Sequence, residues 1–117
     1  MSADATCIFC KIIRREIPSQ VVFENDHALA FRDLRPVAPT HVLVIPKKHV
    51  IGVAEATDDE CEVLGQVVLA ARSVARELGL VEGGYRLVMN NGADAGQSVL
   101  HLHCHVLGGR ALAWPPG

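Results

Sequence analysis

Aromatic side chains are scarce in this chain of 117 residues, at 4%, so its core has to be built mostly from aliphatic groups. The sequence also has no run of about 18 apolar residues, which excludes a membrane-spanning helix. Residues 1–6 lack the basic start and apolar stretch of a signal peptide. Neither sign of charge dominates, because 11 basic residues stand against 13 acidic ones. We therefore expect a cytoplasmic protein that binds neither duplex nucleic acid nor membranes.

The length allows one domain, and no repeat or linker divides residues 1–117. A hydrophobic content of 50% with 21% charged residues is typical of a globular protein. The 4 cysteines could pair as disulfides, but a domain with this much apolar material does not need them. In a reducing compartment they are expected to be thiols or metal ligands.

Hydrophobic periodicity and turn residues predict the elements of secondary structure. Several short strands come first, then one long helix, then two more strands. This order predicts an α+β fold, with a five-stranded antiparallel sheet, one long helix and one short helix. The predicted helices cover residues 8–13 and 58–78, and the predicted strands cover 21–24, 28–33, 42–45, 85–90 and 100–107.

The long helix carries its own start signal and a buried face. Thr57 and Glu60 have the spacing of a capping box, and Gly79 supplies a stop. Cys61, in the first turn, is expected to be a small buried residue. The apolar positions that recur at helical spacing, and are expected to face the core, are Leu64, Val67, Val68, Ala71, Ala75 and Leu78.

Three histidines alternate with apolar residues in the last predicted strand. Side chains alternate across a strand, so His101, His103 and His105 share one face, expected to be the accessible one, while their neighbours pack under the long helix. Three interpretations stay open: an exposed polar face, imidazoles that share a zinc ion, and catalysis at phosphorus. The loop residues Gly96, Gln97 and Ser98 just upstream favour catalysis, because glycine lets backbone amides approach an anion.

Cys7 and Cys10 form a Cys-x-x-Cys motif at the head of the short helix. Such a motif can be a redox pair, half of a zinc site, or two small buried residues. A redox pair would need a preceding strand in a βαβ order, which the sequence lacks. Half a zinc site and a buried pair both remain open.

Residues 96–107 resemble the signature of the histidine-triad (HIT) superfamily, and the tail over residues 108–117 resembles the ending of its HINT branch, the purine nucleoside phosphoramidases. The similarity extends over nearly the whole chain. Further matching segments are residues 9–13, 17–18, 30–31, 38–41 and 44–49.

The resemblance implies a hydrolase that cleaves the P–N bond of purine nucleoside phosphoramidates, adenylyl-lysine included, through a nucleotidyl-histidine intermediate. His103 would be the nucleophile, with His105 and Ser98 on the phosphate and His41 supporting His103. No metal would be required for this chemistry. The nucleotide, AMP or GMP, would be bound by Asp33 at the ribose and by Leu34, Ile8, Asn90, Gly96, Gln97, Ser98, His105 and Trp114.

Bacterial relatives imply a structural zinc ion held by Cys7, Cys10, His49 and His101. His101 would then anchor its strand rather than catalyse. The family also implies a homodimer that joins two sheets, with the tail of one subunit crossing to the other. A disordered tail and a flexible segment over residues 1–6 are the simpler expectations for the chain ends.

Two other functions stay open. One is hydrolysis of dinucleoside polyphosphates, the activity of another branch, against which the Trp-Pro-Pro-Gly ending of the chain argues. The other is a purine-nucleotide sensor or interaction module whose turnover is incidental. Asp33 could likewise be a solvated acid at a strand end, and His27 is expected at the surface.

Overall fold

The computed structural model describes residues 5–117 as one antiparallel sheet with helices on both faces, which confirms the α+β prediction. The strands lie in the order β1-β2-β3-β5-β4. Within the described residues, no helix combines the length and apolar character needed to cross a bilayer. The strands are β1 (Val21–Glu24), β2 (Ala28–Arg32), β3 (Thr40–Pro46), β4 (Tyr85–Val88) and β5 (Cys104–Gly108), and the helices are α1 (Ile8–Ile13), α2 (Cys61–Glu77) and the short 3₁₀ turns η1 (Val53–Glu55), η2 (Asp58–Glu60) and η3 (Ala93–Ala95).

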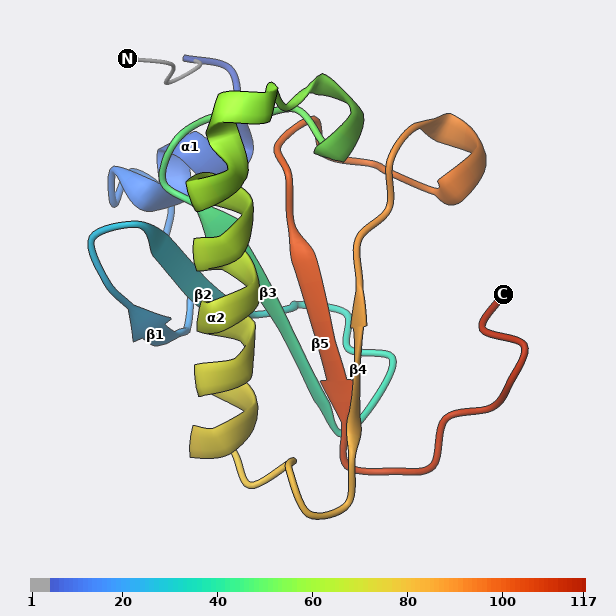
Figure 1. Ribbon diagram of the computed structural model, residues 1–117. Coiled ribbons are helices and arrows are strands. Elements are labelled where there is room, and N and C mark those ends of the chain that lie inside the picture. The colour runs from blue at the N-terminus through green and yellow to red at the C-terminus, as the bar shows by residue number, and fades with distance from the viewer. Residues whose placement is uncertain (1–4) are drawn as a thin grey trace.

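The long helix α2 lies across one face of the sheet (Figure 1). Its start is capped as predicted, since Thr57 N donates to Glu60 Oε1 at 2.8 Å and the reciprocal capping contact is also present. The apolar side of α2 packs against Val42 and Val44 of β3 and against Val106 of β5. This layer is the larger of two cores.

Two details of α2 were predicted wrongly. Val68 is 43% exposed, and Cys61 is also exposed. The buried stripe runs instead through Val67, Ala71 and Val74. Successive residues of a helix are rotated by about 100°, so the position after Val67 turns away from the sheet. Apolar residues such as Val68 are thus left on the outer side of α2.

The short helix α1 covers the opposite face of the sheet, over β2 and β3. Alternation along β3 sends Leu43 and Ile45 to this side, where they pack with Phe9 and Ile12 of α1. The expected flexible segment over residues 1–6 falls mostly outside the described residues. From Ile8 onward the chain is anchored by this second core.

The last strand is shorter than predicted, because β5 begins at Cys104 rather than near residue 100. Its partner β3 ends at Pro46, which has no N–H to continue the ladder. The segment over residues 101–103 bonds to a loop instead, with Leu102 N donating to Val50 O at 2.6 Å. His101 and His103 therefore precede the strand, although their side chains still alternate with those of Leu102 and Cys104.

The first two triad histidines are buried, contrary to the prediction of an accessible face, whereas His105 is half-buried. His101 is 0% exposed and His103 is 7% exposed, because α1 lies over them. Phe9 of α1 makes edge contacts with both rings, at centroid distances of 5.9 and 5.3 Å. The two imidazoles are held in a packed layer, which fixes their orientation.

Candidate functional site

A mostly apolar cavity of about 300 Å³ opens beside α1 and ends at two of the triad histidines. Helix α1 forms one wall and β2 forms another, while the loop before the triad closes a third side. Such a hollow with a few polar groups at one end suits a small ligand with an apolar ring. The residues that line this cavity include Ile8, Phe9, Asp33, Ser98, His103 and His105.

One hydrogen bond fixes the state of the His103 ring. His103 Nδ1 lies 2.7 Å from the backbone carbonyl oxygen of His101. A carbonyl oxygen only accepts, so Nδ1 carries the proton and donates it. Nε2 is then left with its lone pair, on a residue that lines the cavity. A neutral imidazole in this form is a nucleophile.

His41 and His105 form a second chain of hydrogen bonds. Val37 N donates to His41 Nδ1 at 3.1 Å, so the proton of the neutral His41 ring is on Nε2. That nitrogen lies 2.9 Å from His105 Nδ1 and 3.5 Å from an Asp33 carboxylate oxygen. His105 Nδ1 accepts, which leaves the proton of His105 on Nε2. This series of hydrogen bonds therefore ends in an N–H donor on His105, a residue of the cavity wall.

His41 and His105 both favour the neutral form. Burial and the neighbouring His103 and His41 rings lower the pKa of His105 from 6.5 to about 4. Burial also lowers the pKa of His41, and the nearby Asp33 carboxylate offsets only part of that effect. At neutral pH the His41–His105 pair is therefore uncharged.

Cys7, Cys10, His49 and His101 come together as the resemblance predicted, and we call them the thiol–imidazole cluster. One ligand atom from each lies within 4.8 Å of the other three. His101 Nδ1 is 3.3 Å from Cys7 Sγ and 3.1 Å from His49 Nδ1, and Cys10 Sγ is 3.4 Å from His49 Nδ1. Cys7 caps the start of α1 and Cys10 lies within it, and the segments after β3 and before β5 provide the imidazoles.

The donor set of this cluster fits a metal ion. His101 Nε2 donates to the Pro46 carbonyl oxygen at 2.9 Å, so its Nδ1 lone pair points into the cluster. Two sulfurs and two imidazole nitrogens are the ligands of tetrahedral zinc sites. Asp33, His41 and His105 also lie within 4.8 Å of one another, but the Nε2 of His41 carries a proton there. Of the two groups found among residues 5–117, the thiol–imidazole cluster has the donor set that better suits a metal ion.

The structure brings some of the predicted nucleotide-binding residues to the cavity and leaves others away from it. Ile8, Leu34 and Ser98 line it together with Asp33 and His105, although Leu34 is 96% exposed. The other four do not belong to its wall in the described chain. These are Asn90, Gly96, Gln97 and Trp114.

Gln97, which does not line the cavity, stabilises the loop before the triad. The Gln97 side chain accepts from Gly92 N at 2.8 Å and donates to the carbonyl oxygens of Ile51, at 2.7 Å, and Val99. This amide therefore shapes the loop that carries Ser98. Trp114 is 81% exposed in a tail that extends away from the sheet (Figure 1).

Three groups that define the site were missed by sequence reasoning. The Val37 amide and the Pro46 carbonyl determine which ring nitrogen carries the proton in neutral His41 and His101. Both are backbone groups, so residue types in the sequence do not predict them. Phe9 contacts His103 and His101 and had a signal in the sequence. It stands between the two cysteines of the Cys-x-x-Cys motif.

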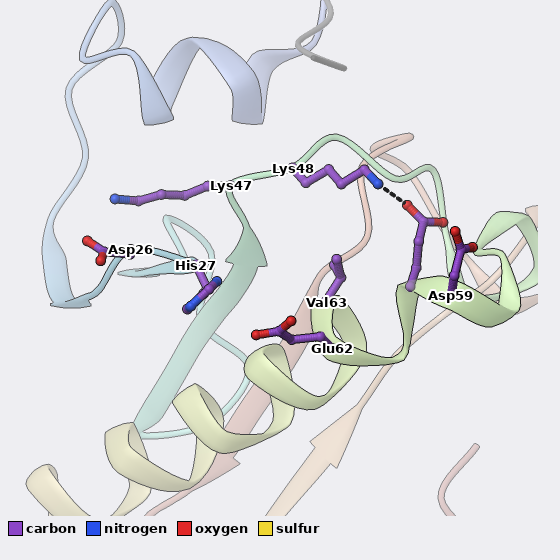
Figure 2. A pocket seen from close by; sticks show the side chains of 8 residues that line it. Asp26, His27, Lys47, Lys48, Asp59, Glu62 and Val63 are labelled. Atoms are coloured by element: carbon purple, nitrogen blue, oxygen red, sulfur yellow. Dashed lines mark ion pairs between the residues drawn. The ribbon is translucent and has the colours of Figure 1, made fainter.

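A second hollow of about 300 Å³ lies between the β2–β3 end of the sheet and the start of α2 (Figure 2). Its walls are charged, and Lys48 Nζ pairs with Glu60 at 2.7 Å. His27 lies at its edge and is exposed, as predicted. This second hollow lacks the apolar walls of the first cavity and its hydrogen-bonded histidines. We therefore take the first cavity as the functional site.

Comparisons with known proteins agree with this geometry. A structure from Legionella pneumophila Philadelphia 1, described as that of a HIT family hydrolase, superimposes with a TM-score of 0.93 and 52% identity, covering 96% of this chain and 100% of that one. A protein of Zea mays named "14 kDa zinc-binding protein" is 51% identical over 116 residues, which are 97% of this chain and 90% of that protein.

A protein of Arabidopsis thaliana named "Adenylylsulfatase HINT1" is 47% identical over 117 residues, with coverage of 98% of this chain and 79% of that protein. The family model described as the HIT domain matches residues 14–112, which include every strand, α2 and all three triad histidines. The chain belongs to the histidine-triad (HIT) domain family.

Proposed function

We propose that this protein hydrolyses the P–N bond of purine nucleoside 5′-phosphoramidates, with His103 as the nucleophile. The observation that carries the proposal is the hydrogen bond from His103 Nδ1 to the His101 carbonyl, which leaves Nε2 unprotonated. The family match, and a close structural relative described as a hydrolase, support a hydrolytic reaction. AMP and GMP are the expected products.

In the first step, His103 Nε2 forms a bond to phosphorus and the bond from phosphorus to the amine breaks. The amine leaves with one proton drawn from solvent, and the His105 Nε2–H and the Ser98 hydroxyl can hydrogen-bond the departing nitrogen. The same groups can hydrogen-bond the phosphate oxygens, and His41 keeps the His105 ring in its donating form. His41 is therefore a positioning residue.

In the second step, water attacks phosphorus and the bond to His103 breaks, which releases the nucleoside monophosphate. The proton that water loses replaces the one taken by the amine, so the site returns to its starting state. The apolar walls from Ile8 and Leu34 would hold the base, and Asp33 would accept hydrogen bonds from the ribose hydroxyls. Asn90, Gly96, Gln97 and Trp114 would join the nucleotide site only through movement of their segments or from a second subunit.

The test is steady-state hydrolysis of adenosine 5′-phosphoramidate by the wild type and by His103→Ala. The variant should lose at least about 1,000-fold in kcat/KM, because the nucleophile is removed. His27→Ala is the matched control, since His27 is exposed and lies away from the cavity, and it should keep wild-type activity. Equal, negligible turnover by all three proteins would refute the proposal and favour a nucleotide sensor.

Two other substrates share the nucleotide half and differ in the leaving group. Adenylyl sulfate is suggested by the name of the Arabidopsis thaliana relative, and dinucleoside polyphosphates are the substrates of another family branch. The same three proteins should be assayed on adenylyl sulfate and on diadenosine triphosphate. A higher kcat/KM on either one than on the phosphoramidate would reassign the substrate while keeping the role of His103.

We also propose that the thiol–imidazole cluster holds a structural zinc ion, as the name of the Zea mays relative suggests for that protein. Zinc there would join α1 to the segments that carry His49 and His101, and would take no part in bond cleavage. Elemental analysis should find one zinc ion per chain, and Cys7→Ala with Cys10→Ala should abolish it. Wild-type protein that binds no zinc in zinc-supplemented buffer would contradict this assignment.

Finally, we propose that the protein is a cytoplasmic homodimer. β4 is an outer strand of the sheet, with only β5 beside it among the described strands, and the outer side of α2 exposes Val68 and Leu69. An unpaired strand edge and exposed apolar side chains each suit contact with a second copy. The thiols fit a reducing compartment, since none of the four cysteines, all within the described chain, forms a disulfide.

A further inference from the structure

His101 belongs to two arrangements at once. Its side chain lies inside the thiol–imidazole cluster, 3.3 Å from Cys7 Sγ and 3.6 Å from Cys10 Sγ. Its backbone carbonyl accepts the hydrogen bond that fixes the His103 ring. A movement of the His101 side chain out of the cluster would therefore also move the acceptor that determines which nitrogen of His103 is free.

Helix α1 makes a second connection between the cluster and His103. Cys7 and Cys10 lie on either side of Phe9, whose ring meets the His103 ring edge-on at a centroid distance of 5.3 Å. The thiols hold α1 against His101, and α1 in turn holds Phe9 against His103. The cluster thus fixes the nucleophile from two directions, one through the backbone and one through an aromatic contact.

The segment around His101 and His103 is packed, but it has few polar restraints outside the cluster. It lies before β5, so the strand ladder does not hold it. The hydrogen bonds that tie it to the rest of the chain are Leu102 N to Val50 O and His101 Nε2 to Pro46 O, at 2.6 and 2.9 Å. Contacts within the cluster supply the remaining polar anchor of this segment.

We propose that the thiol–imidazole cluster is a positioning device for catalysis, which holds His103 in the tautomer with Nε2 unprotonated. Cys7, Cys10, His49 and His101 are then positioning residues, acting through the His101 carbonyl and Phe9. The proposal rests on the proposed function for the role of His103 as nucleophile. Outer groups that orient a reactive ring typically change activity by about 10–100-fold when they are removed.

The experiment compares the full-length wild type with the double variant Cys7→Ala, Cys10→Ala. Imidazole ¹⁵N chemical shifts report the tautomer of His103 directly and need no turnover. The wild type should show one His103 tautomer, protonated at Nδ1, and the double variant a mixture of both. In parallel, kcat on adenosine 5′-phosphoramidate should fall by about 10–100-fold. Cys61→Ala is the matched control, because Cys61 is exposed on α2, and it should match the wild type in both measurements.

If the double variant does not fold, His49→Ala replaces it, because this residue lies at the half-buried edge of the cluster. Chemical shifts of the cluster residues confirm that the cluster is broken. A His103 ring that stays fully in the Nδ1-protonated tautomer would overturn the proposal, even if kcat fell. Failure of the proposed function would look different, since a wild type without phosphoramidate hydrolysis would still show whether the tautomer depends on the cluster.

Discussion

At the scale of single residues, the triad histidines have three different tasks, and their hydrogen-bond partners set these tasks. His103 donates to a carbonyl and keeps a lone pair at Nε2, whereas His105 accepts from His41 and keeps a proton at Nε2. The His101 ring faces two thiols. In the proposed function, these identical side chains would supply a nucleophile, a donor and an anchor.

Burial of neutral histidines makes stability depend on pH. The pKa of His105 is about 4 when folded, against 6.5 ordinarily, so the unfolded chain binds more protons between these values. We predict that the contribution of His105 to the free energy of unfolding is constant above about pH 7 and falls as the pH drops from 6.5 towards 4. Urea unfolding at several pH values measures this.

A matched pair of variants tests how much of the pH dependence of the free energy of unfolding comes from His105. His105→Asn should reduce the slope between pH 6.5 and 4 without removing it, because burial also lowers the pKa of His101 to about 4 and that of His41. His27→Asn, at an exposed position, should leave the slope unchanged. A wild-type curve that rises as the pH falls through this range would contradict the neutral state assigned to the His41–His105 pair.

At the scale of elements, the site depends on how β5 ends as well as on how it begins. Gly109, directly after β5, has φ +93°, and a Cβ there would lie 2.8 Å from Pro39 Cβ. Pro39 directly precedes β3, the strand that carries His41. This glycine therefore permits a close approach between the two strands of the site.

We predict that Gly109→Ala destabilises the fold by about 1–3 kcal/mol, through backbone strain and this overlap. Gly83→Ala is the control, because a Cβ at Gly83 would meet nothing within 4 Å and its φ is not in the left-handed region. Chemical denaturation measures both. Equal stability of the two variants would show that the approach of Gly109 to Pro39 is not tight.

Sequence patterns predicted the elements well where periodicity was strong. The capping box at Thr57, the strands β1 and β2, and the alternation of the histidines were all found in this way. The start of β5 was missed because it depends on Pro46 in another strand, and the burial of His103 because it depends on the docking of α1. These properties arise from contacts between distant segments, which local patterns do not contain.

For the candidate site too, local sequence predicted some features and contacts between distant segments determined the others. Residue types and the family resemblance pointed to the histidines and to the thiol–imidazole cluster, and the structure brings the cluster together. The protonation of each ring could not be predicted, because backbone groups of Val37, Pro46 and His101 determine it. Sequence thus indicated the candidate residues, and tertiary structure indicated which ring nitrogens donate and which accept hydrogen bonds.

At the scale of the whole molecule, one described chain leaves apolar surface uncovered. Leu87 on β4 is 37% exposed, Leu69 on α2 is 44% exposed, and Trp114 in the tail is 81% exposed. A second copy placed beside β4 would bury such groups and could bring the tail towards a neighbouring cavity. The homodimer proposal accounts for these exposures together.

We predict that light scattering during size exclusion finds particles of two 12.6 kDa chains. Leu87→Arg, which places a charge on the outer strand, should shift the protein towards single chains. Val81→Arg is the control, since Val81 is equally apolar and 57% exposed but lies in the loop before β4. Wild-type protein that runs as a single 12.6 kDa chain at all concentrations would contradict the dimer.

The central claim is that His103 Nε2 becomes bonded to phosphorus during turnover. Rapid mixing with adenosine 5′-phosphoramidate, quenching in alkali and peptide mass spectrometry test this directly. The account predicts an adenylyl group on His103, appearing before steady state and absent in His103→Ala. An adenylyl group on a different residue, or full-rate turnover by His103→Ala, would contradict it.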